Sequence, residues 1–207
     1  MPRTLTSDDV DAFKQRIIDA AELQFAEHGP EAVTIRQLAT AVGVSAMTPY
    51  RYFADKDAIL AAVRARAFDR HAQALETAFE LARGGDEAAE SGAVAEAYIR
   101  FAEEHPAAYK LMFDVNQPSA GEYPDLVRAG ERSRQTMTAY LEKAVADGRL
   151  KGEAAFIGHL YWSAIHGPLM LQLSGMLTGG IRARDLIVPM LAALDREVWG
   201  KKAGMAS

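Results

Sequence analysis

Apolar residues recur along this chain at helical spacing, and no segment shows the period of two that is typical of a half-buried strand. The first apolar stripe predicts a helix that Ser7 caps and that Gly29-Pro30 ends. The buried side of this helix comprises Phe13, Ile17, Ala20, Ala21 and Phe25. Because β-hairpin signals are also missing, the sequence predicts an all-α protein.

A pattern of two short helices joined by a tight turn begins at Thr34. Thr34 can cap the first of these helices, and Gln37 completes a capping box. One buried stripe at i, i+3, i+4 and i+7 comprises Ile35, Leu38, Ala39 and Val42. Gly43 ends this helix, and Ser45 can cap the next one. Two helices linked in this way form a helix-turn-helix, whose second helix can enter the major groove of DNA.

The predicted second helix carries side chains suited to contact rather than to a core: Ala46, Met47, Thr48, Tyr50, Arg51 and Tyr52. Threonine and arginine can hydrogen-bond to base edges, methionine can touch a thymine methyl, and tyrosine hydroxyls can donate to phosphates. Pro49 stands where only one intrahelical hydrogen bond would be lost, so we still expect a helix there.

Asp55 is the expected cap of the third helix, and Lys56 follows in its first turn. A cation at this end opposes the helix dipole. Lys56 makes sense if a phosphate binds there, because free helix amides and a lysine together hold an anion. The alternative is a solvated lysine on a surface turn. Beside the helix-turn-helix pattern, we favour the phosphate interpretation.

The later apolar stripes predict further helices and a larger second domain. These helices are expected over residues 93–104, 106–116, 126–146, 154–177 and 184–199, after a polar, acidic loop at 84–92. The predicted domains are a three-helix DNA-binding domain over 8–54, a connecting helix over 55–83, and a regulatory and dimerisation domain over 84–200.

A symmetric dimer is expected, because one helix-turn-helix reads only a half-site. The final two predicted helices are the most apolar part of the second domain and are the expected interface. Its candidate residues are Leu160, Ile187, Leu191, Leu194 and Val198.

Composition narrows these expectations. The chain has 207 residues, a net charge of −5 and no cysteine, which excludes disulfides, thiolate catalysis and Cys-ligated zinc. The lack of cysteine and of a secretory signal fits a cytoplasmic location. The charge is uneven, because residues 34–70 hold six Lys or Arg against three Asp or Glu.

The stretch between Glu153 and Arg182 has no charged residue and is long enough to span a bilayer. It also contains His159, His166 and Gly167-Pro168, and positive charges flank both of its ends. We therefore predict a helix buried in a bundle and no membrane partner.

The helix-turn-helix segments resemble the DNA-binding domain of TetR-type transcriptional regulators. The resemblance spans roughly residues 11–70 and rests on Ile18 to Gly29, Thr34-Ile35-Arg36-Gln37-Leu38-Ala39, Gly43-Val44-Ser45, Tyr50-Arg51-Tyr52-Phe53 and Lys56-Asp57-Ala58-Ile59-Leu60. The family usually has an aliphatic residue where Pro49 stands. The resemblance implies a homodimeric regulator, expected to be a repressor, on an inverted repeat of double-stranded DNA.

The resemblance also implies roles for single residues. Thr34, Tyr50 and Lys56 would hold phosphates, and the residues that would approach base edges are Arg36, Met47, Thr48 and Arg51. Ser45 and Tyr52 complete the candidate DNA-binding set.

A second resemblance lies in Trp162-Ser163-Ala164-Ile165-His166-Gly167, which is similar to the Trp-x-x-x-His-Gly signature of some TetR-like C-terminal domains. Aromatic and Met residues nearby suggest a cavity for a largely apolar small molecule that releases the DNA. The candidate ligand-binding residues are Tyr98, Phe101, His105, Met112, Phe113, Trp162, His166 and Met170. The alternatives are an ordinary core and a DNA-binding regulator without a ligand.

An enzyme or a metal-binding protein is the third alternative. His159 and His166 are seven residues apart on one helix face, about 10 Å by helix rise, too far to share one ion. No His-Glu-x-x-His, phosphate loop or nucleophile motif is found. We therefore predict no catalytic residue, no metal and no cofactor.

Overall fold

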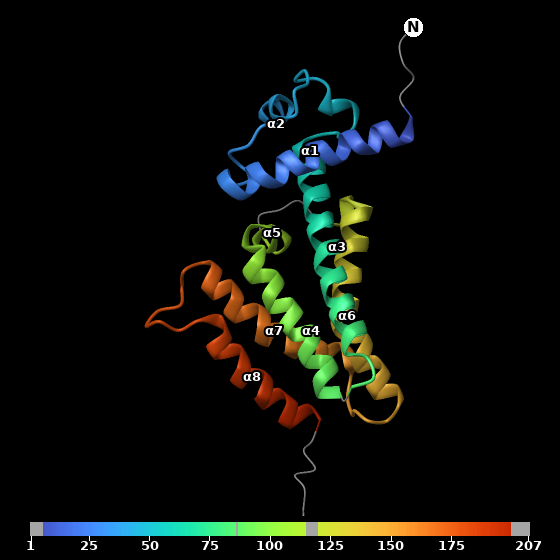
Figure 1. The fold of residues 1–207 in the computed structure, drawn as a ribbon, viewed down its shortest axis with the longest axis vertical. Helices are drawn as coiled ribbons and strands as arrows, with labels where there is room; N and C mark the ends of the chain where they lie inside the picture. Colours follow the sequence, from blue (N-terminus) through green and yellow to red (C-terminus); the bar gives the residue numbers. More distant parts are fainter. Residues whose placement is uncertain (1–5, 86, 115–119, 200–207) are drawn as a thin grey trace, which may run out of the picture. The chain divides into compact units, whose positions relative to one another are not determined.

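The computed structural model describes residues 6–85, 87–114 and 120–199 (Figure 1). Within these residues every regular element is helical, which confirms the predicted all-α class. The elements are α1 (Ser7–His28), α2 (Ile35–Ala41), η1 (Pro49–Arg51), α3 (Lys56–Ala82), α4 (Glu87–Glu104), α5 (Pro106–Met112), η2 (Ala120–Glu122), α6 (Pro124–Ala146), α7 (Ala154–Leu173) and α8 (Ala183–Val198).

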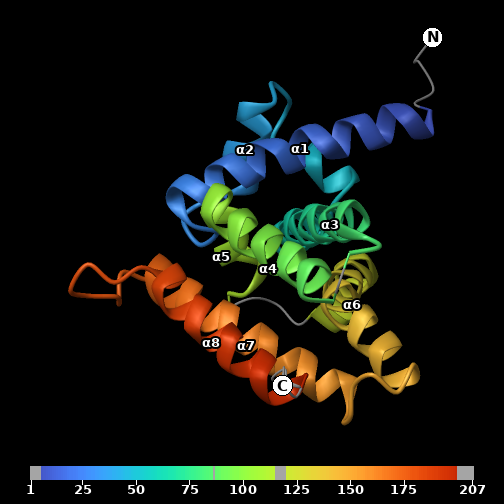
Figure 2. The same cartoon turned by 60° about the horizontal axis from the view of Figure 1, so that its bottom comes forward.

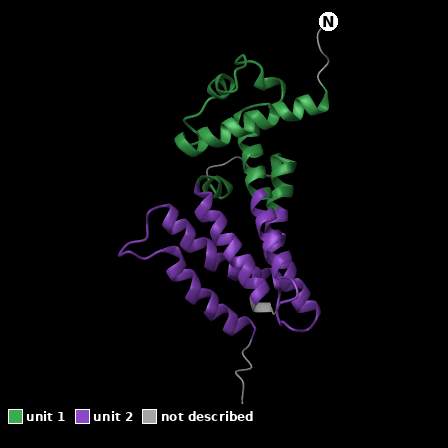
Figure 3. Ribbon diagram, viewed as in Figure 1, with its two compact units in different colours: residues 1–69, 107–130 green, residues 70–106, 131–207 purple. Residues whose placement is uncertain are grey.

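The chain forms two compact units, coloured separately in Figure 3. Unit 1 comprises the residues up to 69 together with 107–130, and unit 2 comprises 70–106 and the residues from 131 onward. Helices α3 and α6 therefore each contribute to both units. The predicted domains divide the chain by function rather than by compactness, and they stay a prediction.

Unit 1 is held together by the apolar faces of α1, α2 and α3. Ile17, Leu38 and Ile59 are completely buried in one cluster. Arg66 of α3 reinforces this packing, because its guanidinium pairs with Asp19 and Glu22 of α1. The N-cap of α1 is Thr6 rather than the predicted Ser7, because Thr6 forms a capping box with Asp9.

Unit 2 contains the antiparallel pair α7 and α8, which lie side by side in Figures 1 and 2. Gly158 of α7 allows close packing on α6, because a Cβ there would come within 2.7 Å of Thr138 Cγ2. Arg184 joins α8 to α4 by bonding to both Glu96 and Glu103 at 2.8–2.9 Å. A core cluster of unit 2 comprises Leu141, Ala144, Leu150, Ile157 and Tyr161.

Three predicted helix limits are wrong. Helix α5 ends at Met112 instead of about residue 116. Helix α4 already begins at Glu87 instead of residue 93, because the alanine and glutamate residues assigned to a loop are good helix formers. Helix α7 ends at Leu173 instead of about residue 177, where Gly175 adopts a φ of 70°. In the described part of the chain, no helix has the length and apolarity that crossing a membrane requires.

Candidate DNA-binding segment and effector cavity

Local hydrogen bonds fix both ends of α2, as the sequence predicts. Thr34 accepts from the Gln37 amide at 3.3 Å, and its own amide donates to Gln37 Oε1 at 2.7 Å. At the other end Gly43 has a φ of 74°, and the Val44 amide donates to the Ala39 carbonyl at 3.0 Å. This geometry turns the chain sharply from α2 into the next segment.

That segment, residues 45–53, is the reading segment, and it is not the α-helix that the sequence predicts. It contains the one-turn 3₁₀ helix η1, in which the amides of Arg51 and Tyr52 donate to the carbonyls of Thr48 and Pro49 at 3.2 and 2.9 Å. The physical reason is Pro49, which lacks an amide hydrogen and favours the tighter turn.

The reading segment is anchored by apolar residues and exposes the candidate contact residues. Pro49 and Phe53 are buried, whereas Met47 is 70% and Tyr50 50% exposed. Arg51 is exposed too, as is Arg36 on α2. A methionine and a tyrosine left in water beside two arginines have no role in the core.

Three other predicted DNA-binding residues already have partners within unit 1. Ser45 Oγ and Thr48 Oγ1 share a hydrogen bond of 2.8 Å. Tyr52 is half-buried, with its ring centroid 4.5 Å from that of Phe13. These contacts fix the shape of the reading segment, and a role in DNA contact stays a prediction for all three residues.

Lys56 has a structural contact that the sequence did not reveal. Its Nζ donates to the Pro30 carbonyl oxygen at 3.0 Å, while Asp55 caps α3 by accepting from the Ala58 amide at 2.8 Å. The ammonium group has three donors. Lys56 therefore ties the turn after α1 to the start of α3, and its predicted phosphate contact stays a prediction.

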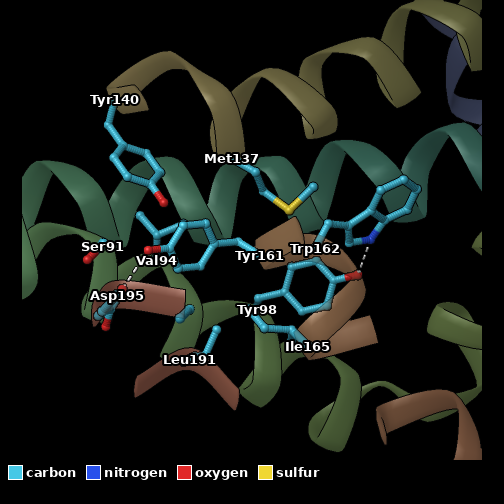
Figure 4. A pocket seen from close by; sticks show the side chains of 12 residues that line it. Ser91, Val94, Tyr98, Met137, Tyr140, Tyr161, Trp162, Ile165, Leu191 and Asp195 are labelled. Atoms are coloured by element: carbon cyan, nitrogen blue, oxygen red, sulfur yellow. Dashed lines mark hydrogen bonds between the residues drawn. The ribbon is translucent and has the colours of Figure 1, made fainter. Parts of the chain in front are cut away.

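Unit 2 contains a partly open cavity of about 80 Å³, shown in Figure 4 and called here the tyrosine cavity. Four helices contribute its lining, which comprises Ser91, Gly92, Val94, Ala95 and Tyr98 of α4, Met137 and Tyr140 of α6, Tyr161, Trp162 and Ile165 of α7, and Leu191 and Asp195 of α8. Four of these side chains are aromatic, and the walls between them are mostly aliphatic.

Hydrogen bonds order both ends of the tyrosine cavity. At one end the Tyr161 hydroxyl donates to Asp195 Oδ1 at 2.6 Å and accepts from Trp199 Nε1 at 3.2 Å. At the other end the Tyr98 hydroxyl accepts from Trp162 Nε1 at 2.9 Å (Figure 4). His166 Nδ1 lies 3.4 Å from the same hydroxyl.

Burial keeps the histidine and tyrosine side chains around this cavity uncharged. Burial lowers the pKa of His71, whose ring lies edge-on to Tyr98, to about 3, and also lowers the pKa of His166. Burial and the nearby Asp195 carboxylate raise the pKa of Tyr140 and of Tyr161. Both tyrosines and both histidines are therefore neutral at pH 7.

The structure gathers only part of the predicted ligand set at this cavity. Tyr98 and Trp162 line the cavity, and His166 stands behind Tyr98 as its hydrogen-bond neighbour. The other predicted residues do not line it: Phe101, His105, Met112, Phe113 and Met170. Of these, Met112 and Phe113 belong to unit 1, and Phe113 packs there against Phe68 and Tyr109.

Sequence reasoning missed Tyr140, Tyr161 and Asp195. Asp195 follows Tyr161 by 34 residues, so no local spacing marks the hydrogen bond between them. A usable signal was a tyrosine in each of the predicted helices 126–146 and 154–177.

The predicted interface residues on α8 mostly face the core of unit 2. Ile187 is completely buried, which corrects its assignment to an exposed interface. The partly buried residues that pack on the core cluster are Leu191, Leu194 and Val198, and Leu160 of α7 is half-buried. An α8 stripe that covers its own core looks the same in sequence as one that covers a partner.

No group of three or more His, Asp or Glu side chains is placed to hold a metal ion among the residues that the structure describes. A capped helix, a tight turn and an exposed contact segment make up a helix-turn-helix of the DNA-binding class, and a second helical unit with a partly open cavity accompanies it.

Comparison with known proteins gives the family. The family model for bacterial regulatory proteins of the tetR family matches residues 17–63, and the model for the Tetracyclin repressor-like C-terminal domain matches residues 92–194. The chain belongs to the TetR family of transcriptional regulators, and its N-terminal part is the DNA-binding domain of that family.

Three similar proteins are informative. An uncharacterized HTH-type transcriptional regulator from Mycobacterium tuberculosis is 27% identical over 191 residues, which cover 88% of this chain and 82% of that protein. An HTH-type transcriptional repressor from the same organism is 36% identical over 63 residues, 30% of this chain and 33% of that protein. The structure of a protein with unknown function from Rhodococcus sp. RHA1 is 28% identical, has a TM-score of 0.78 and covers 96% of this chain and 99% of that chain.

Proposed function

We propose that this protein is a homodimeric repressor that binds an inverted repeat through its reading segment and leaves the DNA when a small molecule enters the tyrosine cavity. The observation that carries the proposal is the display of Met47, Tyr50 and Arg51 on one exposed turn. The Met47 side chain can touch a thymine methyl, the Tyr50 hydroxyl can donate to a phosphate, and the Arg51 guanidinium can bond to guanine.

Arg36 and Thr34 extend this surface from the start of α2. Arg36 is exposed two residues after the cap, so it can approach DNA together with the reading segment. The Schellman turn at Gly43 and the buried Pro49 fix the backbone between the two groups. A preorganised reading surface loses little conformational entropy when it binds.

Dimerisation is supported by the apolar residues that α7 and α8 leave in water. Phe156 is 62% and Val188 66% exposed, although both lie on helices whose other faces are packed. Ser163 and Ala192 are exposed small residues on the same two helices, and small residues let helix backbones approach closely. These four residues replace Ile187 as the centre of the proposed two-fold interface.

A repressor role is supported by the relative that is named a repressor, which shares 63 aligned residues with this chain. Effector release is supported by the cavity and by α3, one continuous helix that contributes to both units. A ligand shifts DNA affinity only by its differential affinity for the two conformations, typically about 5–150-fold.

The test selects binding sites from random DNA with the full-length protein and footprints the selected sequence. The proposal expects a footprint with two-fold symmetry and a dimer mass in light scattering. Arg51→Ala should relax base preference within both half-sites. An asymmetric footprint made by a monomer would contradict binding as a dimer. An unchanged base preference of Arg51→Ala would contradict base recognition by the reading segment.

A further inference from the structure

We infer that the tyrosine cavity takes the cationic head of an organic amine or quaternary ammonium compound, with Asp195 and the surrounding aromatic rings as its recognition elements. This inference deepens the proposed function and rests on it only for the consequence of binding, because the ligand class follows from the lining itself.

Charge is the first argument. Among the described residues that line the cavity, Asp195 is the one charged side chain. One carboxylate oxygen accepts from the Tyr161 hydroxyl, and Asp195 is exposed, so its charge stays in contact with water until a ligand arrives. A carboxylate ligand would meet only a like charge here, whereas a cation meets its counter-charge.

The aromatic rings are the second argument. Tyr98, Tyr140, Tyr161 and Trp162 line the same cavity from three helices. Aromatic faces attract cations, and cages of several rings are the usual way in which proteins bind quaternary ammonium groups. Figure 4 shows Tyr140 and Tyr161 beside Asp195, with Trp162 and Tyr98 at the far end. The carboxylate and all four rings therefore border one space, with Tyr140 and Tyr161 nearest the carboxylate.

The neutral state of the neighbouring histidines is the third argument. His166 lies against Tyr98, and His71 packs edge-on to the same ring at a centroid distance of 4.7 Å. Both histidines are uncharged at pH 7, because burial lowers their pKa values. No positive charge from these two groups competes with a cation for the aromatic faces.

Space is the fourth argument. A volume of about 80 Å³ suits a small head group and not a whole drug-sized molecule. Tyr140 also lines a neighbouring hollow of about 340 Å³, whose apolar wall includes Leu75 and Phe79 of α3. Tyr140 is therefore shared by the head-group cavity and by a larger hollow beside α3, the helix that reaches the DNA-binding unit.

The experiment compares two isosteric probes on the full-length protein by calorimetry or by a thermal-shift titration. Benzyltrimethylammonium carries the cationic head, and neopentylbenzene has the same shape without the charge. We expect the cation to bind at least tenfold more tightly than its neutral isostere. Equal affinity of the two probes, or no binding of the cation, would overturn the inference.

Variants locate the site. Asp195→Asn keeps an acceptor for Tyr161 and should abolish most of the preference for the cation, while Glu197→Gln removes the same charge from an exposed position on α8 and should preserve it. If Asp195→Asn does not fold, Tyr140→Leu removes one ring and should weaken the cation more than the isostere. Equal losses for both probes would contradict the cage.

Operator release is measured separately with the same cation. Tight, Asp195-dependent binding without any change in DNA affinity would uphold the ligand class and remove the effector role from the proposed function. Release of DNA by the neutral probe alone, without preference for the cation, would uphold the effector role and overturn the ligand class.

Discussion

The reading segment and the tyrosine cavity differ in how the chain builds them. The reading segment is continuous, and its buried anchors Pro49 and Phe53 stand among the exposed residues that they position. The tyrosine cavity takes its lining from four helices, between Ser91 and Asp195. The first site depends on local backbone geometry, whereas the second exists only when unit 2 is packed.

Because of this difference, substitutions in the two sites should have different consequences. A substitution at an exposed residue of the reading segment, such as Met47 or Arg51, changes the surface offered to DNA without disturbing a core. A substitution in the cavity changes ligand recognition and core packing together, since Tyr161 and Leu191 belong to both. Effects on DNA reading and on ligand binding should therefore be separable only at the exposed members of each site.

The largest expected effect comes from breaking the proposed dimer. Phe156→Asp or Val188→Asp places a charge on an apolar surface that a partner would cover. We expect monomers and a loss of operator affinity of about 100-fold or more, because two linked half-sites bind with avidity. Sedimentation and fluorescence anisotropy measure the two effects.

The matched control for this experiment is Leu81→Asp, which changes a residue of α3 that is 84% exposed. It introduces the same charge on a different helix, outside the residues proposed for the interface, and should leave the dimer intact. A dimer that survives both Phe156→Asp and Val188→Asp would place the interface elsewhere.

The next largest effect concerns base preference at the reading segment. Arg51→Ala should cost about 1–3 kcal/mol at particular base pairs and much less elsewhere, because a bidentate arginine contact discriminates one base from another. Competition binding with single-base variants of the selected operator measures it. Arg16→Ala is a contrasting variant, since Arg16 bonds to the Val42 carbonyl at 2.5 Å and should affect stability without changing base preference.

Acid should weaken unit 2 through His71. Its pKa falls from 6.5 to about 3 on folding, so the unfolded chain binds the extra proton as pH drops below 6.5, and stability is lost progressively towards pH 3. At pH 5 this loss is about 2 kcal/mol. Urea unfolding at pH 7.5 and pH 5 measures it.

The variant for the acid experiment is His71→Asn, which cannot titrate and can still bond to Ser133. It should be less stable than the parent at pH 7.5, because it loses ring contacts with Tyr98 and Phe101. The difference between the two pH values should nevertheless shrink by about 2 kcal/mol. An unchanged difference would show that His71 is not the acid-sensitive group.

The smallest effect concerns Lys56. Lys56→Met removes the bond to Pro30 and should cost about 1 kcal/mol of unfolding free energy. If the remaining ammonium donors also hold a phosphate, the salt dependence of DNA binding should flatten by about one contact. Lys110→Met, an exposed residue of α5, is the control for lost charge. A stability loss with an unchanged salt slope would leave Lys56 with a structural role only.

The sequence predicts the local contacts of this molecule better than the contacts between residues far apart in the chain. Thr34 and Gly43 were placed correctly because capping bonds join residues three to five positions apart. Lys56 bonds to Pro30, 26 residues away, and Tyr161 bonds to Asp195, 34 residues away. Helical periodicity cannot predict contacts at such separations.

Two further errors have different causes. Pro49 was read as tolerable in an α-helix, but removing one amide was enough to leave a single 3₁₀ turn. Ile187 was assigned to the interface because an apolar helical stripe does not say whether its own core or a partner covers it. The first outcome follows from the residue itself, and the second follows from its tertiary environment.

The most direct test of the account measures operator affinity by fluorescence anisotropy for the parent protein, Arg51→Ala and Asp195→Asn, with and without benzyltrimethylammonium. The account predicts that Arg51→Ala weakens DNA binding and leaves ligand affinity unchanged, while Asp195→Asn binds the operator like the parent and is no longer released by the cation. Weak operator binding by Asp195→Asn without ligand, together with normal release by the cation, would contradict the division of work between the two sites.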